Sequence, residues 1–217
     1  MAAWIDGPAS PQFRAVALDG LTAFDALPAL LPAEMAQNLE HAPRGACVAW
    51  GIPFEVEGML ALAPGAKAAL KPAPFRAGWL VFMHAADARP LEWNQHGLIS
   101  PARGHGRLNE LAAVYTVVYA GGSEERLEIR RRLHINTFNL GWGENAFECV
   151  AAHKPTPGSP EQTQMVEGWG WQQTRVNTND RFAWTNWLWA WQNPHPEREV
   201  IELRLEGGGG TTVLAGV

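Results

Sequence analysis

Tryptophans beside amide and carboxylate side chains are the first feature of this 217-residue sequence that could do chemistry. Four tryptophans and three of their polar neighbours lie in the segments LEWNQHG, NLGWGENAF and EGWGWQQTRVNTND. They are Trp93, Asn94, Trp142, Glu144, Asn145, Trp169 and Trp171. An indole stacks on the C–H face of a sugar ring, while amides and carboxylates bind its hydroxyl groups. We therefore predict a sugar site in these loops. The alternative is that the tryptophans only pin long loops onto the fold.

A second group of tryptophans raises the same question in a different setting. Trp187, Trp189 and Trp191 are spaced two apart, so in a β-strand all three indoles point to one face. They form either a flat sugar-binding platform or a wall of the hydrophobic core. Indoles bury a large apolar area, so we expect at least two of the three to be buried. Trp191 should be the most buried, because the turn at Asn193-Pro194 follows it.

Catalytic and metal-binding motifs are scarce. The sequence has no G-x-S-x-G, P-loop, H-E-x-x-H or paired C-x-x-C motif. The remaining candidates are the carboxylate pairs Glu144/Glu148 and Glu55/Glu57, and the metal-ligand pairs His96/His105 and Cys149/His153. Two residues alone do not make a site, so we expect no catalytic residues, no transition metal and no cofactor. A structural calcium ion bound by loop carbonyls stays open, since it leaves little trace in sequence.

The charge pattern argues against nucleic acid and membrane partners. The net charge is -5, with 17 Lys and Arg, so there is no general attraction to phosphate backbones or anionic lipids. In the segment 126–135 apolar and charged residues alternate, which predicts that two of the arginines in the run RRR (130–132) lie on a solvated strand face. The N-terminal segment has neither a basic leader nor an apolar signal core, so we expect a cytoplasmic protein if the chain is full length.

Short apolar runs separated by Gly, Pro and Asn predict an all-β fold of about nine strands. We expect one β-sandwich domain over residues 1–217, with a long loop insertion near 151–181. In the segment 78–85 both faces of the predicted strand are apolar, so it should be a central strand that is covered on both sides. Residues 21–39 contain two prolines and should hold a short helix at most. The expected strands are 14–19, 46–50, 54–62, 78–85, 112–120, 126–135, 184–192, 199–206 and 211–215.

Three segments resemble a known family. YTVVYAGGSEERLEI (115–129), LHINTFNLGWG (133–143) and AWTNWLWAWQNPHPEREVIELRLEG (183–207) are similar to the galactose-binding-like jelly-roll modules attached to bacterial glycoside hydrolases and related hydrolases. The late W-x-N-P-x-P element is the most specific part. The chain departs from the family pattern in its long insertion and at Ala120-Gly121, where an acidic turn residue is usual. The resemblance implies a galactose-binding-like jelly roll, and such modules bind sugars in some hosts and brace a catalytic domain in others.

The expected function is therefore a non-catalytic, carbohydrate-binding-like accessory module whose partner is a neutral oligo- or polysaccharide. Two other hypotheses stay open. The chain could be a bracing or interaction domain that packs on the catalytic domain of a larger hydrolase and has no ligand of its own. It could also be a small-molecule enzyme that uses the loop containing His96 and His105.

Overall fold

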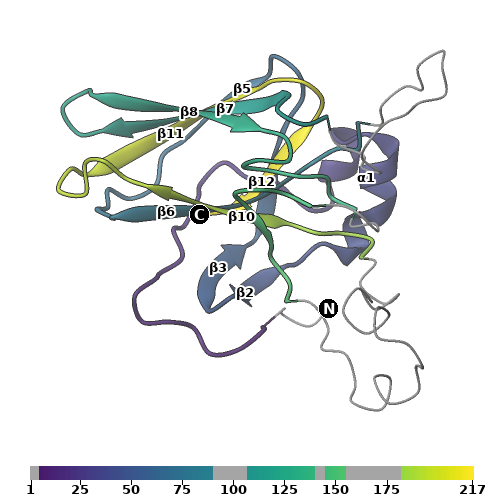
Figure 1. The fold of residues 1–217 in the computed structure, drawn as a ribbon, viewed down its shortest axis with the longest axis horizontal. Helices are drawn as coiled ribbons and strands as arrows, with labels where there is room; N and C mark the ends of the chain where they lie inside the picture. Colours follow the sequence, from purple (N-terminus) through teal and green to yellow (C-terminus); the bar gives the residue numbers. More distant parts are fainter. Residues whose placement is uncertain (1–4, 90–106, 140–144, 155–181) are drawn as a thin grey trace, which may run out of the picture.

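The computed structural model describes residues 5–89, 107–139, 145–154 and 182–217, which fold mostly into antiparallel β-strands (Figure 1). The larger sheet has six strands, in the order β1 (Thr22–Ala23), β4 (Gly58–Leu62), β12 (Thr212–Gly216), β6 (Trp79–Ala86), β10 (Trp187–Gln192) and β9 (Val150–Ala151). The smaller sheet has four strands, in the order β5 (Lys67–Leu70), β11 (Val200–Gly207), β7 (Leu111–Tyr119) and β8 (Glu124–Arg130).

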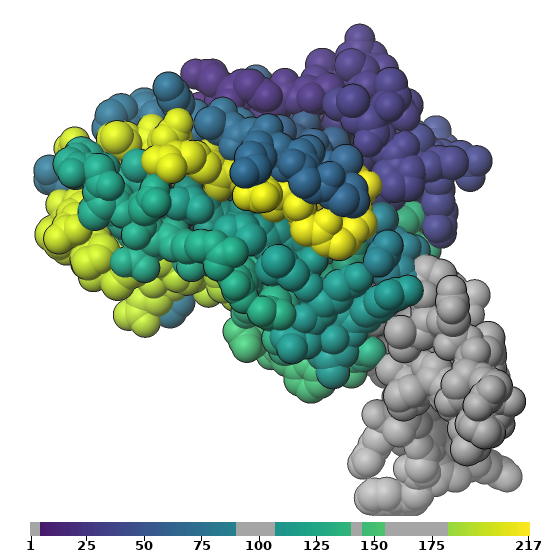
Figure 2. All heavy atoms as spheres, turned by 90° about the horizontal axis from the view of Figure 1, so that it is seen from above, coloured from purple at the N-terminus to yellow at the C-terminus, as the bar shows by residue number. Residues whose placement is uncertain are grey.

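A third layer lies on the other side of the six-stranded sheet. It consists of the hairpin of β2 (Gly45–Ala49) and β3 (Ile52–Val56) and of three short helices, η1 (Leu27–Ala29), α1 (Ala33–Asn38) and η2 (Leu39–His41). The six-residue α1, which begins directly after Pro32, agrees with the expectation of a short helix at most within residues 21–39. In Figure 2 these N-terminal residues, in purple, lie along one side of the molecule.

Two hydrophobic cores explain why the six-stranded sheet is apolar on both faces. Between the sheets, Leu80 and Phe82 of β6 pack in one cluster with Tyr115 of β7. On the opposite face, Val81 and Met83 of β6 pack with the N-terminal layer. The prediction that this segment is a covered central strand is confirmed, since β6 lies between β12 and β10 and only Trp79 at its start is exposed.

The tryptophan row of β10 is mainly core. Trp187 and Trp189 are 3% and 8% exposed and belong to the cluster between the sheets, which confirms that at least two of the three are buried. The expectation for Trp191 is wrong, because this indole is only half-buried. Near its end β10 reaches the rim of the sheet, and the residues on either side of Trp191 are exposed.

The turn after β10 is fixed by a buried polar contact. The Tyr119 hydroxyl donates a 2.6 Å hydrogen bond to Oδ1 of Asn193, and Nδ2 of Asn193 donates to the Ala77 carbonyl at 2.8 Å. Burial raises the pKa of Tyr119 to about 12, so its hydroxyl stays protonated and acts as the donor. The W-x-N-P element therefore holds the end of β10 against β7.

His84 is a second enclosed polar group. Its Nε2 donates to the His134 carbonyl at 2.8 Å, because a carbonyl can only accept, and its Nδ1 therefore accepts from the Tyr115 hydroxyl at 3.1 Å. Complete burial lowers the pKa of His84 to about 3. The ring is neutral at any ordinary pH and fully hydrogen-bonded inside the core.

The sequence reading fails at the arginine run. Strand β8 ends at Arg130, and Arg132 takes a positive φ of 60°, so the alternation of faces stops there. Arg131 is fully buried, which agrees with its place on the apolar face of the predicted strand, whereas Arg132 was predicted on the solvated face and is only 7% exposed. The predicted solvated face therefore ends at Arg130, which is half-buried. Other boundaries differ as well: residues 14–19 form no strand, and the expected strand 54–62 is divided into β3 and β4. Strand β5 was not expected, and the expected strand 184–192 begins only at Trp187. Cys47 and Cys149 are buried in different cores and do not form a disulfide.

Candidate functional site

Most of the sugar-binding residues predicted from sequence lie outside the described residues: Trp93, Asn94, Trp142, Glu144, Trp169 and Trp171. The metal candidates His96 and His105 lie outside them as well. Asn145 is described, and its side-chain oxygen accepts a hydrogen bond from Arg132. Its carbonyl accepts from Nδ2 of Asn136 at 3.2 Å, so Asn145 has a structural role in holding the chain next to the turn at Arg132.

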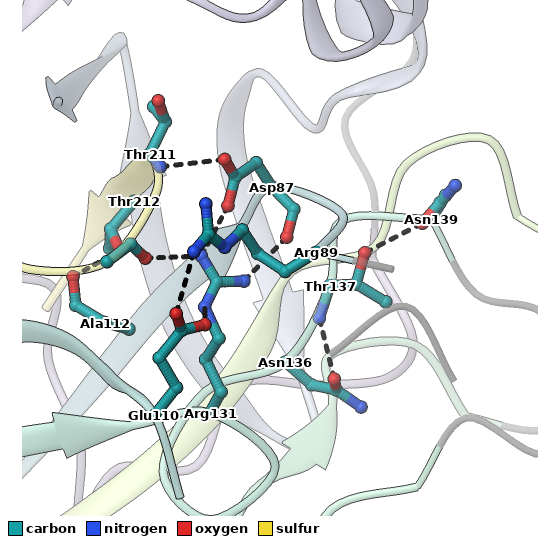
Figure 3. A network of polar contacts seen from close by, with 11 residues as sticks. Asp87, Arg89, Glu110, Ala112, Arg131, Asn136, Thr137, Asn139, Thr211 and Thr212 are labelled. Atoms are coloured by element: carbon teal, nitrogen blue, oxygen red, sulfur yellow. Dashed lines mark hydrogen bonds and ion pairs between the residues drawn. The ribbon is translucent and has the colours of Figure 1, made fainter. Parts of the chain in front are cut away.

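The described part of the chain contains a buried ionic network, the Arg131 cluster, made of Asp87, Arg89, Glu110 and Arg131 (Figure 3). The Arg131 guanidinium forms ion pairs with Asp87 and, through Nε at 3.3 Å, with Glu110. It also donates to the carbonyls of Asp87 and Gly209, at 2.7 and 2.8 Å. The cluster thus ties the ends of β6 and β8 to the start of β7 and to the loop between β11 and β12.

The charges of the Arg131 cluster are matched inside the protein. Two guanidinium groups face two carboxylates, and Asp87 also accepts from the Thr211 amide at 2.9 Å. Burial lowers the pKa of Arg131, while the neighbouring Asp87 and Glu110 oppose this shift and keep the guanidinium charged. With its charges already paired, the cluster has little to offer a ligand, and we assign it a structural role.

A different region offers polar groups that are not paired. A cavity of about 350 Å³, the Asn186 pocket, lies where the segment before β10 meets η2 and the residues after β9. This volume is at the small end of the range for small-molecule sites, roughly 300–1,000 Å³. The lining residues are Glu40, His41, Ala42, Pro43, Arg44, His153, Phe182, Trp184, Thr185 and Asn186.

The backbone at the floor of the Asn186 pocket is held firmly by its neighbours. The Thr185 amide donates to the Phe138 carbonyl, and the Asn186 carbonyl accepts from the Ala152 amide at 2.8 Å. The Trp184 ring packs against Phe138 with a centroid separation of 5.4 Å, and Trp184 is buried in the core. The side chains at 185 and 186 therefore extend from a rigid support, as a preorganised binding site requires.

Two polar groups at this floor have no hydrogen-bond partner among the described residues. They are the Thr185 hydroxyl and Nδ2 of Asn186, and the two residues are 1% and 2% exposed. Nε1 of Trp184 donates to Oδ1 of Asn186 at 3.0 Å, and because an indole N–H can only donate, this contact fixes the orientation of the amide. Leaving a buried polar group unpaired costs about 1–3 kcal/mol.

The walls of the Asn186 pocket are aromatic and of mixed charge. The rings of Phe182 and His153 are in contact, with a centroid separation of 3.7 Å and a tilt of 35° between their planes. Arg44 lies over the Phe24 ring at 4.2 Å, and its Nε is another buried donor without a partner among the described residues. Glu40 and His41 at the rim are exposed. With one arginine and one glutamate, the lining has no strong preference for an anion or a cation, which favours a neutral ligand.

The sequence reading missed this pocket for a clear reason. Its lining comes from three separate segments, 40–44, 153 and 182–186, and the sequence does not say that they meet. One local signal was present. In AWTNW a hydroxyl and an amide side chain stand next to each other between tryptophans, directly before a strand that is otherwise apolar. Buried polar side chains in such a setting need partners, which makes them candidates for a site.

Three further findings concern metal ions, membrane spans and known proteins. Within the described ranges no three His, Cys, Asp or Glu side chains are grouped closely enough to hold a metal ion. Among the helices of the described residues, none has the length and apolar character needed to cross a membrane. Comparison of the chain with protein-family models, with curated proteins and with solved structures finds no match.

Proposed function

We propose that this chain is a non-catalytic, carbohydrate-binding-like accessory module, and that the Asn186 pocket binds a residue of a neutral oligo- or polysaccharide. The single observation that supports this most strongly is the pair of buried, unpartnered groups on Thr185 and Asn186 in a cavity with aromatic walls. Sugars present closely spaced hydroxyls and a flat C–H face, and the pocket offers complementary groups for both. The resemblance to galactose-binding-like jelly rolls agrees with this proposal. On the basis of that resemblance we also propose that the fold is a galactose-binding-like jelly roll.

The experiment is a glycan array followed by calorimetric titration of the best ligand. We expect a Kd on the order of 10 μM to 1 mM, which is roughly 4–7 kcal/mol of binding free energy. Binding to a neutral sugar should change little between low and high salt, because no ionic contact drives it.

Two threonine variants connect the binding to the pocket. Thr185→Val removes a hydroxyl that has no internal partner and should weaken binding about fivefold to tenfold, the equivalent of one hydrogen bond. Thr212→Val is the matched control: Thr212 is equally buried, but its hydroxyl donates to the Ala112 carbonyl at 3.2 Å and does not line the pocket. The control should bind like the wild type.

Two outcomes would contradict the proposal. If no glycan on a broad array binds, a bracing domain on a larger hydrolase becomes the better account. If a glycan binds and its affinity is the same in Thr185→Val as in the wild type, the sugar site lies elsewhere, first in the loops that contain Trp142 and Trp171.

A further inference from the structure

A second cavity lies at the opposite end of β10 from the Asn186 pocket. This cavity of about 460 Å³, the Trp79 pocket, is enclosed by residues 11–16, the start of β3 and residues 75–81. Trp79 pairs with Gln192 at the end of β10, whereas Asn186 precedes the start of that strand. Six strand residues span about 20 Å, so the two pockets are separate sites.

The apolar surface of the Trp79 pocket is aromatic and open to solvent. Trp79 and Phe13 are 52% and 36% exposed, and both line the cavity. Trp79 has the same strand parity as Val81, so it points to the side of the sheet that the N-terminal layer covers farther along β6. At Trp79 this cover ends, which leaves half of a large indole accessible at the edge of a cavity. A flat ring can stack there.

The charged side chains of the Trp79 pocket are positive, whereas the net charge of the chain is negative. The net charge is -5, yet the only charged side chains among the lining residues are Arg14 and Arg76. Arg76 has an ion pair with Glu199 at 3.2 Å, but both side chains are exposed, so this contact is weak and easily exchanged. No ion pair with Arg14 is formed within the described residues.

The Trp79 pocket also contains polar groups other than the two arginines. Gln12 contributes an exposed amide that can bind hydroxyls. Val217 also lines the cavity, and one of its main-chain oxygens accepts a 2.9 Å hydrogen bond from the Val16 amide, so this oxygen is already engaged. The pocket therefore combines an indole face, a neutral amide and two guanidinium groups, which are the donors that bind carboxylates in bidentate geometry.

We propose that the Trp79 pocket binds an acidic sugar, namely a uronic acid residue whose ring stacks on Trp79 and whose carboxylate pairs with Arg14 and Arg76. The saccharide class rests on the proposed function, while the acidic character comes from this pocket alone. The module then has two sites of different charge preference, a neutral one at Asn186 and an acidic one at Trp79.

The test is calorimetric titration with a short oligogalacturonate and, separately, with a neutral galactose oligomer of the same length. The double variant Arg14→Gln/Arg76→Gln should weaken oligogalacturonate binding at least about tenfold, since it removes both charge-assisted contacts. Trp79→Ala should abolish it. Oligogalacturonate binding should also weaken several-fold when the salt concentration is raised from about 0.05 to 0.5 M. Arg204→Gln is the control, since this exposed arginine lies on the four-stranded sheet outside the pocket.

The variants separate this inference from the proposed function. Thr185→Val should leave oligogalacturonate binding unchanged. Neutral binding without any oligogalacturonate binding would overturn the inference and leave the proposed function standing. Oligogalacturonate binding that survives the double arginine variant, or that is lost in Thr185→Val, would equally overturn it.

Discussion

The Arg131 cluster and the Asn186 pocket are both built from buried polar side chains, but they differ in where the partners of those side chains lie. In the Arg131 cluster the guanidinium finds two carboxylates and two carbonyls within the protein. In the Asn186 pocket the Thr185 hydroxyl and one end of the Asn186 amide find none among the described residues. Nε of Arg131 and Oε2 of Glu110 make no hydrogen bond either, but they face each other as an ion pair at 3.3 Å. The first arrangement therefore uses most of its binding capacity in folding, and the second keeps it for something outside the protein.

Burial alone does not distinguish a structural cluster from a binding site, whereas the location of the hydrogen-bond partners does. Burial and charge make the Arg131 cluster the more conspicuous of the two regions, yet its geometry supports only a structural role. The neutral Asn186 pocket is less conspicuous, yet it contains donors whose desolvation is not compensated. The two regions therefore differ in charge pairing, and the Asn186 pocket combines neutral atoms that lack a hydrogen bond with a cavity.

The largest expected effect concerns the Arg131 cluster. Arg131→Met removes the buried guanidinium, leaves the half-buried Asp87 without its ion-pair partner and leaves Glu110 with Arg89 alone. We expect the free energy of unfolding to fall by about 3–5 kcal/mol in urea titrations. Arg204→Met is the control, since its exposed ion pairs on the four-stranded sheet should contribute less than about 1 kcal/mol. Equal effects of the two variants would remove the structural half of the comparison.

The next effect concerns His84, which is enclosed like Arg131 but neutral. Its pKa is lowered to about 3 in the folded protein, whereas the unfolded chain takes up the proton near pH 6.5. Between these pH values only the unfolded state binds the proton, so the free energy of unfolding falls as the pH falls. The slope from His84 approaches about 1.4 kcal/mol per pH unit below pH 6.5, and the total from pH 7 to 5.5 is roughly 1.3 kcal/mol.

The variant His84→Gln tests this assignment. It has no titrating ring, so its unfolding free energy should depend less on pH in this range than that of the wild type. His41→Gln, which changes an exposed histidine, should keep the wild-type slope. The assignment is wrong if His84→Gln and the wild type show the same slope.

The smallest effect compares two buried threonines. Thr212→Val should lower the free energy of unfolding by about 1 kcal/mol, because it leaves the Ala112 carbonyl without its hydroxyl donor. Thr185→Val should cost nothing or stabilise slightly, because it removes a hydroxyl that has no internal partner. Paired thermal and urea unfolding measure the difference, and a larger loss for Thr185→Val would show that its hydroxyl is satisfied within the protein.

The sheet architecture could be predicted from the sequence, because period-two patterns and glycine turns are local signals. The hairpin of β7 and β8 follows the Gly121-Gly122 signal, and both glycines have positive φ. The alternation failed at Arg132, because the turn at this residue ends the strand and nothing in the run RRR marks that change. The half-buried state of Trp191 was also beyond reach, since it depends on where the covering layers end.

The candidate site could be predicted only in its chemistry. The expectation that tryptophans beside amides and carboxylates bind sugars covers the amide of Asn186 next to Trp184, as well as the loops that the sequence favoured. The Thr185 hydroxyl was not part of that expectation. The sequence does not show that η2 meets the end of β9 and the segment before the start of β10, because this contact is a property of the tertiary fold. Whether a buried amide is paired depends on contacts across such distances, and no local pattern reports it.

The most direct test of the central claim is a nitrogen–proton NMR titration of the protein with its best neutral glycan. The side-chain amide signal of Asn186 and the indole signal of Trp184, which are joined by a hydrogen bond, should shift in proportion to saturation. The indole signal of Trp187, which donates to the Thr137 carbonyl at 2.8 Å in the core, should stay in place. If the glycan binds and the Asn186 amide signal does not move, the Asn186 pocket is not the site and the account of its unpaired donors is contradicted.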